Sequence, residues 1–206
     1  MSRTLRIDLF CEDRAQEEML KHLVRRLCEE EGVDASIEVR VARGGRGKTY
    51  EELRGYQLLV EKSGLSRPDL LVVAIDANCS SHAAKVREVR EKIDAGLFPY
   101  HAIACPDPHI ERWYMADGDA FLEVVGAQPP RAEPKCDKET RNVLKRALAA
   151  SVRAAGHPAI LGGIEFAAEL AQAMDPFRAG RADPALKHFI DDVRSALRQL
   201  RPASPQ

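Results

Sequence analysis

Residues 70–76 have the sequence Leu-Leu-Val-Val-Ala-Ile-Asp, six apolar side chains followed by a carboxylate. An apolar run of this length without polar alternation is typical of a β-strand that is buried on both faces. Strands of that kind belong to parallel sheets whose two faces are covered by helices. The stretch therefore predicts an α/β domain, with Asp76 at the end of a buried strand.

The neighbouring segments continue this alternation of strands and helices. Further strands are predicted at 4–11, 36–41 and 101–105, and helices at 14–31, 50–61 and 83–94. Strand and helix in strict alternation indicate a mostly parallel sheet. We expect a compact, Rossmann-like sheet of about four strands with helices on both sides.

The second half of the chain has a different character. After a proline-bearing stretch at 129–134, the apolar spacing predicts only helices, at 137–155, 164–174 and 184–200. The sequence thus predicts an α/β domain over 1–126 and a helical C-terminal portion over 127–206, packed on the first domain.

Composition excludes several classes of protein. The 206 residues carry 31 basic and 32 acidic side chains, a formal net charge of -1, so the chain is not a polycationic nucleic-acid binder. Its five cysteines form no CxxC pair, which argues against a disulfide framework and a structural zinc site. No apolar run is long enough to cross a bilayer. These features predict a reduced, cytoplasmic protein without a membrane partner.

Two carboxylates follow predicted strands: Glu12 follows the first, and Asp76 ends the strand quoted above. The carboxyl ends of parallel strands form the functional edge of such a sheet. Asn78 adds a second oxygen on the same turn as Asp76, and oxygen ligands suit Mg²⁺ or Mn²⁺. The alternative is structural, because a carboxylate after a strand often caps the next helix, as Glu12 or Asp13 could do.

Three segments together resemble the Toprim-like proteins, the superfamily of topoisomerase and primase domains. They are Phe10-Cys11-Glu12-Asp13-Arg14-Ala15-Gln16-Glu17, Val72-Val73-Ala74-Ile75-Asp76-Ala77-Asn78 and Ile110-Glu111-Arg112-Trp113-Tyr114-Met115-Ala116-Asp117. The sequence is most similar to the small bacterial branch related to the overcoming-lysogenization-defect nucleases. The resemblance covers about the first 120 residues, and it implies a role in phage defence beside an ATPase partner.

The resemblance also implies site residues and a reaction, phosphodiester cleavage or transfer on nucleic acid. Glu12 would be a general acid/base or a metal ligand, and Asp76 and Asn78 would hold Mg²⁺ or Mn²⁺. Glu111 belongs to the same pattern. The family has a second aspartate at the position of Asn78, and this uncharged amide should lower the affinity for a metal ion. A non-catalytic subunit that binds an ATPase or nucleic acid is therefore an alternative.

A glycine-rich segment, Ala42-Arg43-Gly44-Gly45-Arg46-Gly47-Lys48-Thr49, lies between a predicted strand and a predicted helix. In one interpretation Arg43, Arg46 and Lys48 bind phosphate groups of a nucleic acid. In another the segment is the phosphate loop of an NTPase or kinase that uses Gly47, Lys48, Thr49 and Asp76, although alanine replaces the first glycine. In a third interpretation the segment is a solvated turn before the helix.

Other side chains have simpler interpretations. Segment 131–153 has seven basic and three acidic residues, and Lys138, Arg141 and Lys145 fall on one helical face. That face is either solvated or a track for phosphates. We expect Trp113 and Tyr114 to pack against the core.

Overall fold

The structure is a computed structural model that describes residues 3–42, 46–78, 80–130 and 142–201. Its strands are β1 (Leu5–Cys11), β2 (Ala35–Val41), β3 (Leu70–Ala74) and β4 (His101–Ala104). Its helices are α1 (Arg14–Glu30), α2 (Arg46–Lys62), α3 (His82–Arg90), α4 (Glu111–Tyr114), α5 (Gly118–Val125), α6 (Val143–Ala154), α7 (Ala167–Ala173), α8 (Pro176–Ala182) and α9 (Pro184–Leu200), with a 3₁₀ turn at Ile164–Phe166.

The four strands form one sheet in the order β2-β1-β3-β4, and every pairing is parallel. The predicted α/β class and mostly parallel sheet are confirmed. β3 is buried along its whole length, as its continuous apolar sequence requires. β1 pairs with β2 on one side and β3 on the other, so it is also central.

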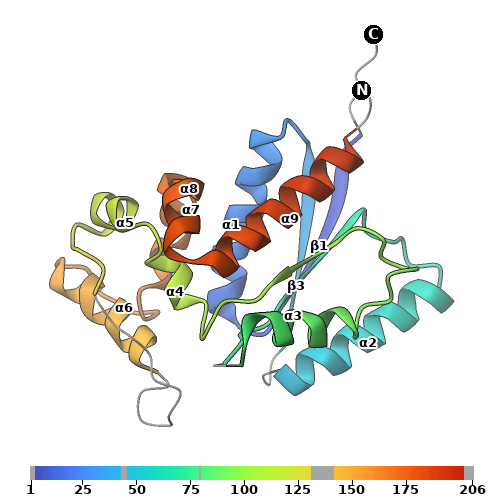
Figure 1. The fold of residues 1–206 in the computed structure, drawn as a ribbon, viewed down its shortest axis with the longest axis horizontal. Coiled ribbons are helices and arrows are strands. Elements are labelled where there is room, and N and C mark those ends of the chain that lie inside the picture. Colours follow the sequence, from blue (N-terminus) through green and yellow to red (C-terminus); the bar gives the residue numbers. More distant parts are fainter. Residues whose placement is uncertain (1–2, 43–45, 79, 131–141, 202–206) are drawn as a thin grey trace.

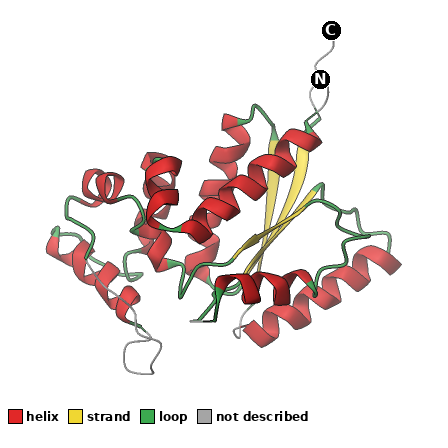
Figure 2. Ribbon diagram, viewed as in Figure 1, coloured by secondary structure: helices red, strands yellow, loops and turns green. Residues whose placement is uncertain are grey.

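Helices cover both faces of the sheet, as Figures 1 and 2 show. On one face, alternate residues of β1 and β3 pack with α1 and α9 in a large hydrophobic cluster. On the other face, Phe10, Leu71 and Val73 pack with α2 and α3 in a smaller one. The pleat explains the division, because successive side chains of a strand point to opposite faces.

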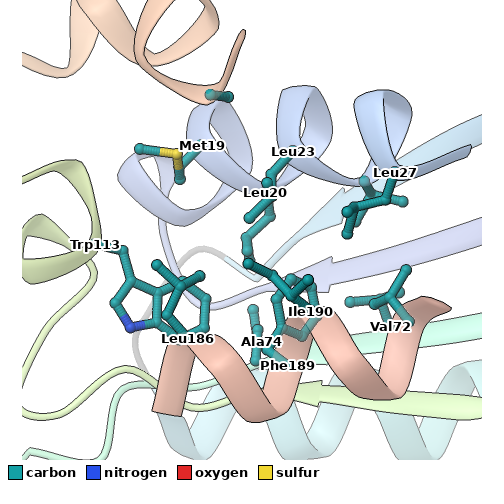
Figure 3. Packing of buried hydrophobic residues seen from close by; sticks show 14 of the residues in the cluster. Met19, Leu20, Leu23, Leu27, Val72, Ala74, Trp113, Leu186, Phe189 and Ile190 are labelled. Carbon is teal, nitrogen blue, oxygen red and sulfur yellow. The ribbon is translucent and has the colours of Figure 1, made fainter. Parts of the chain in front are cut away.

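The C-terminal helix returns to the sheet after α5, α6, α7 and α8, which lie to one side of it (Figure 1) and share its large hydrophobic cluster. Figure 3 shows the result: side chains of α1 and α9 meet over β3, with Trp113 of α4 at one end. Phe189 of α9 stacks on Trp113, with ring centroids 5.6 Å apart. The large cluster therefore continues across the predicted boundary at residue 126. Trp113 and Tyr114 are buried, as predicted.

The helix boundaries differ from the sequence predictions in several places. α2 begins at Arg46, four residues before the predicted start. The predicted helix 164–174 is a 3₁₀ turn followed by α7. Of the predicted helix 137–155, residues 137–141 lie outside the described part, and α6 begins at Val143. The short helices α5 and α8 were not predicted, because eight and seven residues contain too few turns for a clear apolar period.

Within the described ranges, no helix combines the length and the apolar character that crossing a membrane requires.

Candidate functional site

The strand order creates a switch point between β1 and β3. The chain passes from β1 to β2 on one side and then crosses back to β3 on the other side of β1. In open parallel sheets, ligands bind outside the carboxyl ends of the strands at such a switch point. The residues that follow Cys11 of β1 and Ala74 of β3, which pair with each other, are therefore the first candidates for a site.

Glu12 and Asp76 meet at this switch point. The Glu12 Oε2 atom accepts a hydrogen bond from the backbone N–H of Asp76, at 3.3 Å. Asp76 is almost completely buried, with 5% of its surface exposed. A buried carboxylate is costly unless donors or a cation surround it. The groups that contact Asp76 therefore indicate what kind of ligand this site can bind.

Gln16 links the two strand ends from the first turn of α1. Its side-chain Oε1 accepts a hydrogen bond from the N–H of Glu12 at 2.8 Å, and its Nε2 donates one to Asp76 Oδ1 at 2.8 Å. Asp13 caps the same helix by accepting from the N–H of Gln16, so its predicted capping alternative is confirmed. Gln16 is completely buried. Its role was not predicted, because its position in the sequence does not distinguish it from the other residues on the buried face of α1.

His109 contacts the second oxygen of Asp76, with 3.0 Å between Nδ1 and Oδ2. The loops that follow β3 and β4 bring the pair together. The N–H of Ala77 donates to the carbonyl oxygen of Pro106, and the N–H of Asn78 donates to that of Pro108. Both oxygens of Asp76 are thus engaged by buried side chains, Gln16 on one and His109 on the other.

Glu111 starts α4 beside this group and is 3% exposed. Its Oε2 atom is buried and has no hydrogen-bond partner. Burial, with a smaller contribution from the nearby Asp76 and Asp13 charges, raises the pKa of Glu111 in spite of a favourable contact with Lys145. Tyr114 ties α4 to the site, because its hydroxyl donates to the carbonyl oxygen of Ala15 at 2.9 Å.

Lys145 reaches the same group from α6. Its Nζ atom lies 3.6 Å from Glu111 Oε1 and 3.8 Å from Asp13 Oδ2. Burial alone would lower the pKa of Lys145, but the charges of Glu111, Asp13 and Asp76 outweigh burial and raise it. Lys145 therefore remains an ammonium ion among carboxylates. The sequence placed it on a basic helical face without indicating this contact, and Lys138 and Arg141 of that face lie outside the described residues.

Asn78 follows Asp76 in a left-handed conformation, with φ 51°. Its Nδ2 donates to the carbonyl oxygen of Asp76 at 3.2 Å, which stabilises the turn after β3. The role of Asn78 as a metal ligand stays a prediction, because this contact joins its side-chain amide to the backbone of Asp76.

The glycine-rich segment lies at the carboxyl end of the edge strand β2 and leads into α2. Arg43 and the two following glycines lie outside the described residues, as does the side chain of Arg46. Lys48 is half exposed and lies 3.4 Å from Glu51 Oε2, on the surface of its own helix. Neither the predicted phosphate contact of Lys48 nor the phosphate-loop alternative gains support from this pairing.

The donor set is compatible with a divalent cation. Glu12, Asp76 and Glu111 offer carboxylate oxygens, the ligands that Mg²⁺ and Mn²⁺ prefer, and the unpartnered Oε2 of Glu111 is an unused buried acceptor. In the described part of the chain, no three His, Cys, Asp or Glu side chains are already arranged to hold a metal ion. An ion would therefore have to replace one of the hydrogen bonds that Asp76 now accepts.

Comparisons with protein-family models, with curated proteins and with solved structures found no match to this chain.

Proposed function

We propose that the protein is a metal-dependent nuclease or phosphodiester-transfer protein of Toprim-like type. One observation carries the proposal: Glu12 and Asp76 are hydrogen-bonded at the switch point of a parallel sheet, beside a buried carboxylate with an unused oxygen. Acidic side chains gathered where a ligand is expected offer the oxygen ligands that Mg²⁺ and Mn²⁺ prefer, and nucleic-acid chemistry commonly uses these ions.

Glu12, Asp76 and Glu111 would hold the ion. When bound, a divalent ion neutralises charge on a scissile phosphate and lowers the pKa of a water molecule. The protein's own contribution is positional. Gln16 fixes Glu12 and Asp76 relative to each other through two hydrogen bonds of 2.8 Å.

Lys145 is suited to a phosphate oxygen. Its ammonium group is held between Glu111 and Asp13, and its pKa is raised, so it carries a positive charge at neutral pH. A fixed positive charge in a partly buried site stabilises the charge that develops on a phosphate during transfer. Removing it should lower turnover more than substrate binding.

The test is cleavage of plasmid DNA and of RNA with Mg²⁺ and with Mn²⁺. Glu12→Gln and Asp76→Asn keep the size of each side chain, and each should reduce cleavage by about 100-fold or more, the scale on which single electrostatic groups of active sites act. Glu123→Gln, an exposed carboxylate on α5, is the matched control and should cleave like wild type. Equal cleavage by all four proteins would reject the assigned roles.

A non-catalytic subunit is the second candidate, and Asn78 favours it. Its amide bonds to backbone where a carboxylate would add charge, and both oxygens of Asp76 already accept hydrogen bonds. In that case wild type does not cut, and Asn78→Asp should create metal-dependent cleavage.

An ATPase partner acting with the protein in phage defence, and a cytoplasmic location, belong to the proposal in either form. Titration of ATP against wild type and Lys48→Ala tests the phosphate-loop alternative, which unchanged binding would reject.

A further inference from the structure

We infer that two copies of this chain pair along the free edge of β2, so that their two sheets join into one continuous sheet. β2 lies at the end of the strand order, and among the described strands it pairs with β1 alone. A free strand edge offers a row of backbone donors and acceptors with which another strand can pair. The inference goes beyond the proposed function and does not depend on it.

The hydrogen bonds between β2 and β1 show which backbone groups of β2 face outward. The C=O of Asp34 accepts from the N–H of Leu5, and the N–H of Ala42 donates to the C=O of Cys11. Since neighbouring residues of a strand direct these groups to opposite sides, even-numbered residues bond to β1 and odd-numbered residues face the free edge. No hydrogen bond from the described residues reaches these outward groups. They belong to Ala35, Ile37, Val39 and Val41.

The side chains of the outward residues are only partly covered. Ile37, Val39 and Val41 are half-buried and pack against the margin of the large hydrophobic cluster. The five residues of β3, by contrast, are all buried. A second strand beside β2 would remove this apolar margin from water, and burial of apolar surface is the dominant favourable contribution to most protein association.

The opposite face of β2 carries one acidic and one basic side chain, Glu38 and Arg40. Glu38 Oε2 and Arg40 Nη2 lie 3.0 Å apart, and the two side chains are 53% and 34% exposed. Arg40 is held in place by the buried Asp8, whose Oδ2 atom is 3.4 Å from its Nε, and by the ring of Tyr56 beneath its guanidinium. Both charges are therefore available to a strand placed beside β2.

These features fit an antiparallel pairing of two β2 strands about a twofold axis at Val39. Val39 then faces Val39 of the second copy, and Ile37 faces its Val41, so outward backbone groups meet outward backbone groups. The same register sets Glu38 opposite Arg40 of the other copy, twice, at positions without backbone hydrogen bonds, where facing side chains are closest. An axis at residue 38 or at residue 40 would set like charges opposite each other. Charge therefore selects the register at Val39.

The geometry also limits the size and the strength of the assembly. A twofold contact uses up both β2 edges, so it closes at a dimer. One strand edge of seven residues is small for a protein interface, and small interfaces belong to weak complexes. We therefore expect a dissociation constant in the micromolar range.

The experiment is sedimentation velocity of the full chain at a series of micromolar concentrations. Glu38→Lys sets two cations opposite each other at both charged positions of the dimer. Val39→Pro removes an outward N–H that makes no bond to β1, a change that edge strands tolerate. Glu123→Lys makes the same charge change at an exposed position of α5 and is the matched control. Far-ultraviolet circular dichroism checks that each variant is folded.

Wild type and Glu123→Lys should form dimers with the same dissociation constant. Glu38→Lys should raise this constant at least about tenfold, because two attractive pairs become repulsive, and Val39→Pro should sediment as a monomer. A monomeric wild type, or a Glu38→Lys or folded Val39→Pro variant that dimerises like Glu123→Lys, would overturn the inference.

The register is tested by mixing Glu38→Lys with Arg40→Glu. Each variant alone sets like charges opposite each other, whereas the mixture pairs opposite charges at both positions and should recover dimerisation. A mixture of folded chains that stays monomeric would overturn the assigned pairing. The other variants decide the question if Arg40→Glu, which loses its contact with Asp8, does not fold.

Discussion

Replacing Phe189 by alanine should destabilise the whole α/β domain, although the residue lies far beyond the domain boundary predicted at residue 126. The Phe189 ring is 1% exposed and stacks on Trp113 with an interplanar angle of 25°. Removing a fully buried phenylalanine ring costs about 3–5 kcal/mol, including the cavity that remains. Since small domains are stable by only about 5–15 kcal/mol, this loss is a large share of the total.

The assay is urea unfolding, followed by far-ultraviolet circular dichroism and by the fluorescence of Trp113, the one tryptophan of the chain. Phe177→Ala is the matched control. Phe177 lies on α8 and is 73% exposed, so its loss should change the free energy of unfolding by less than about 0.5 kcal/mol. The two variants remove the same atoms and differ in burial.

A truncated chain that ends at residue 182 extends the test to the whole of α9. This helix buries five large apolar side chains, each contributing about 1.5–3 kcal/mol, so their sum is comparable to the stability of a domain. The buried side chains are Leu186, Phe189, Ile190, Val193 and Leu197. We expect the truncated chain not to fold. A cooperative transition at the wild-type midpoint for this chain, or for Phe189→Ala, would refute the reasoning.

Two further predictions concern the helices beside the sheet. Gly163→Ala should lower the free energy of unfolding, measured in urea, by more than about 2 kcal/mol, because φ is 98° and a Cβ would lie 2.7 Å from Leu148 Cγ. Gly162→Ala is the control, since Gly162 has φ 77° and open space around it, and it should cost only about 1–2 kcal/mol. Equal losses for the two variants would contradict this reasoning. Burial raises the pKa of Asp117, but hydrogen bonds from Arg178 and from backbone N–H groups outweigh burial and lower it. Its contribution to stability is therefore complete above the unfolded pKa of about 3.9 and is lost as the pH falls through the lower folded value. Urea midpoints from pH 2 to 7 should fall less steeply on the acid side for Asp117→Asn than for wild type, and parallel curves would reject this role.

The candidate site was partly predictable. Glu12 and Asp76 could be assigned to strand ends because apolar periodicity identifies strands locally, and parallel strands place their carboxyl ends together. Gln16 and Lys145 could not be assigned in the same way. Each is an ordinary polar residue in its own segment, and only its contact with a distant carboxylate makes it part of the site.

The order of strands and helices over the first 104 residues, the burial of β3 and the polar ends of β1 and β3 were determined by the sequence itself. All of them follow from the local spacing of apolar side chains, which each segment carries independently of its neighbours. The tertiary structure alone decided that α9 covers the sheet beside α1 and that α6 brings Lys145 to Glu111. Those contacts join residues far apart in the chain, and they form because the apolar face of each helix has to be buried against another element of the fold.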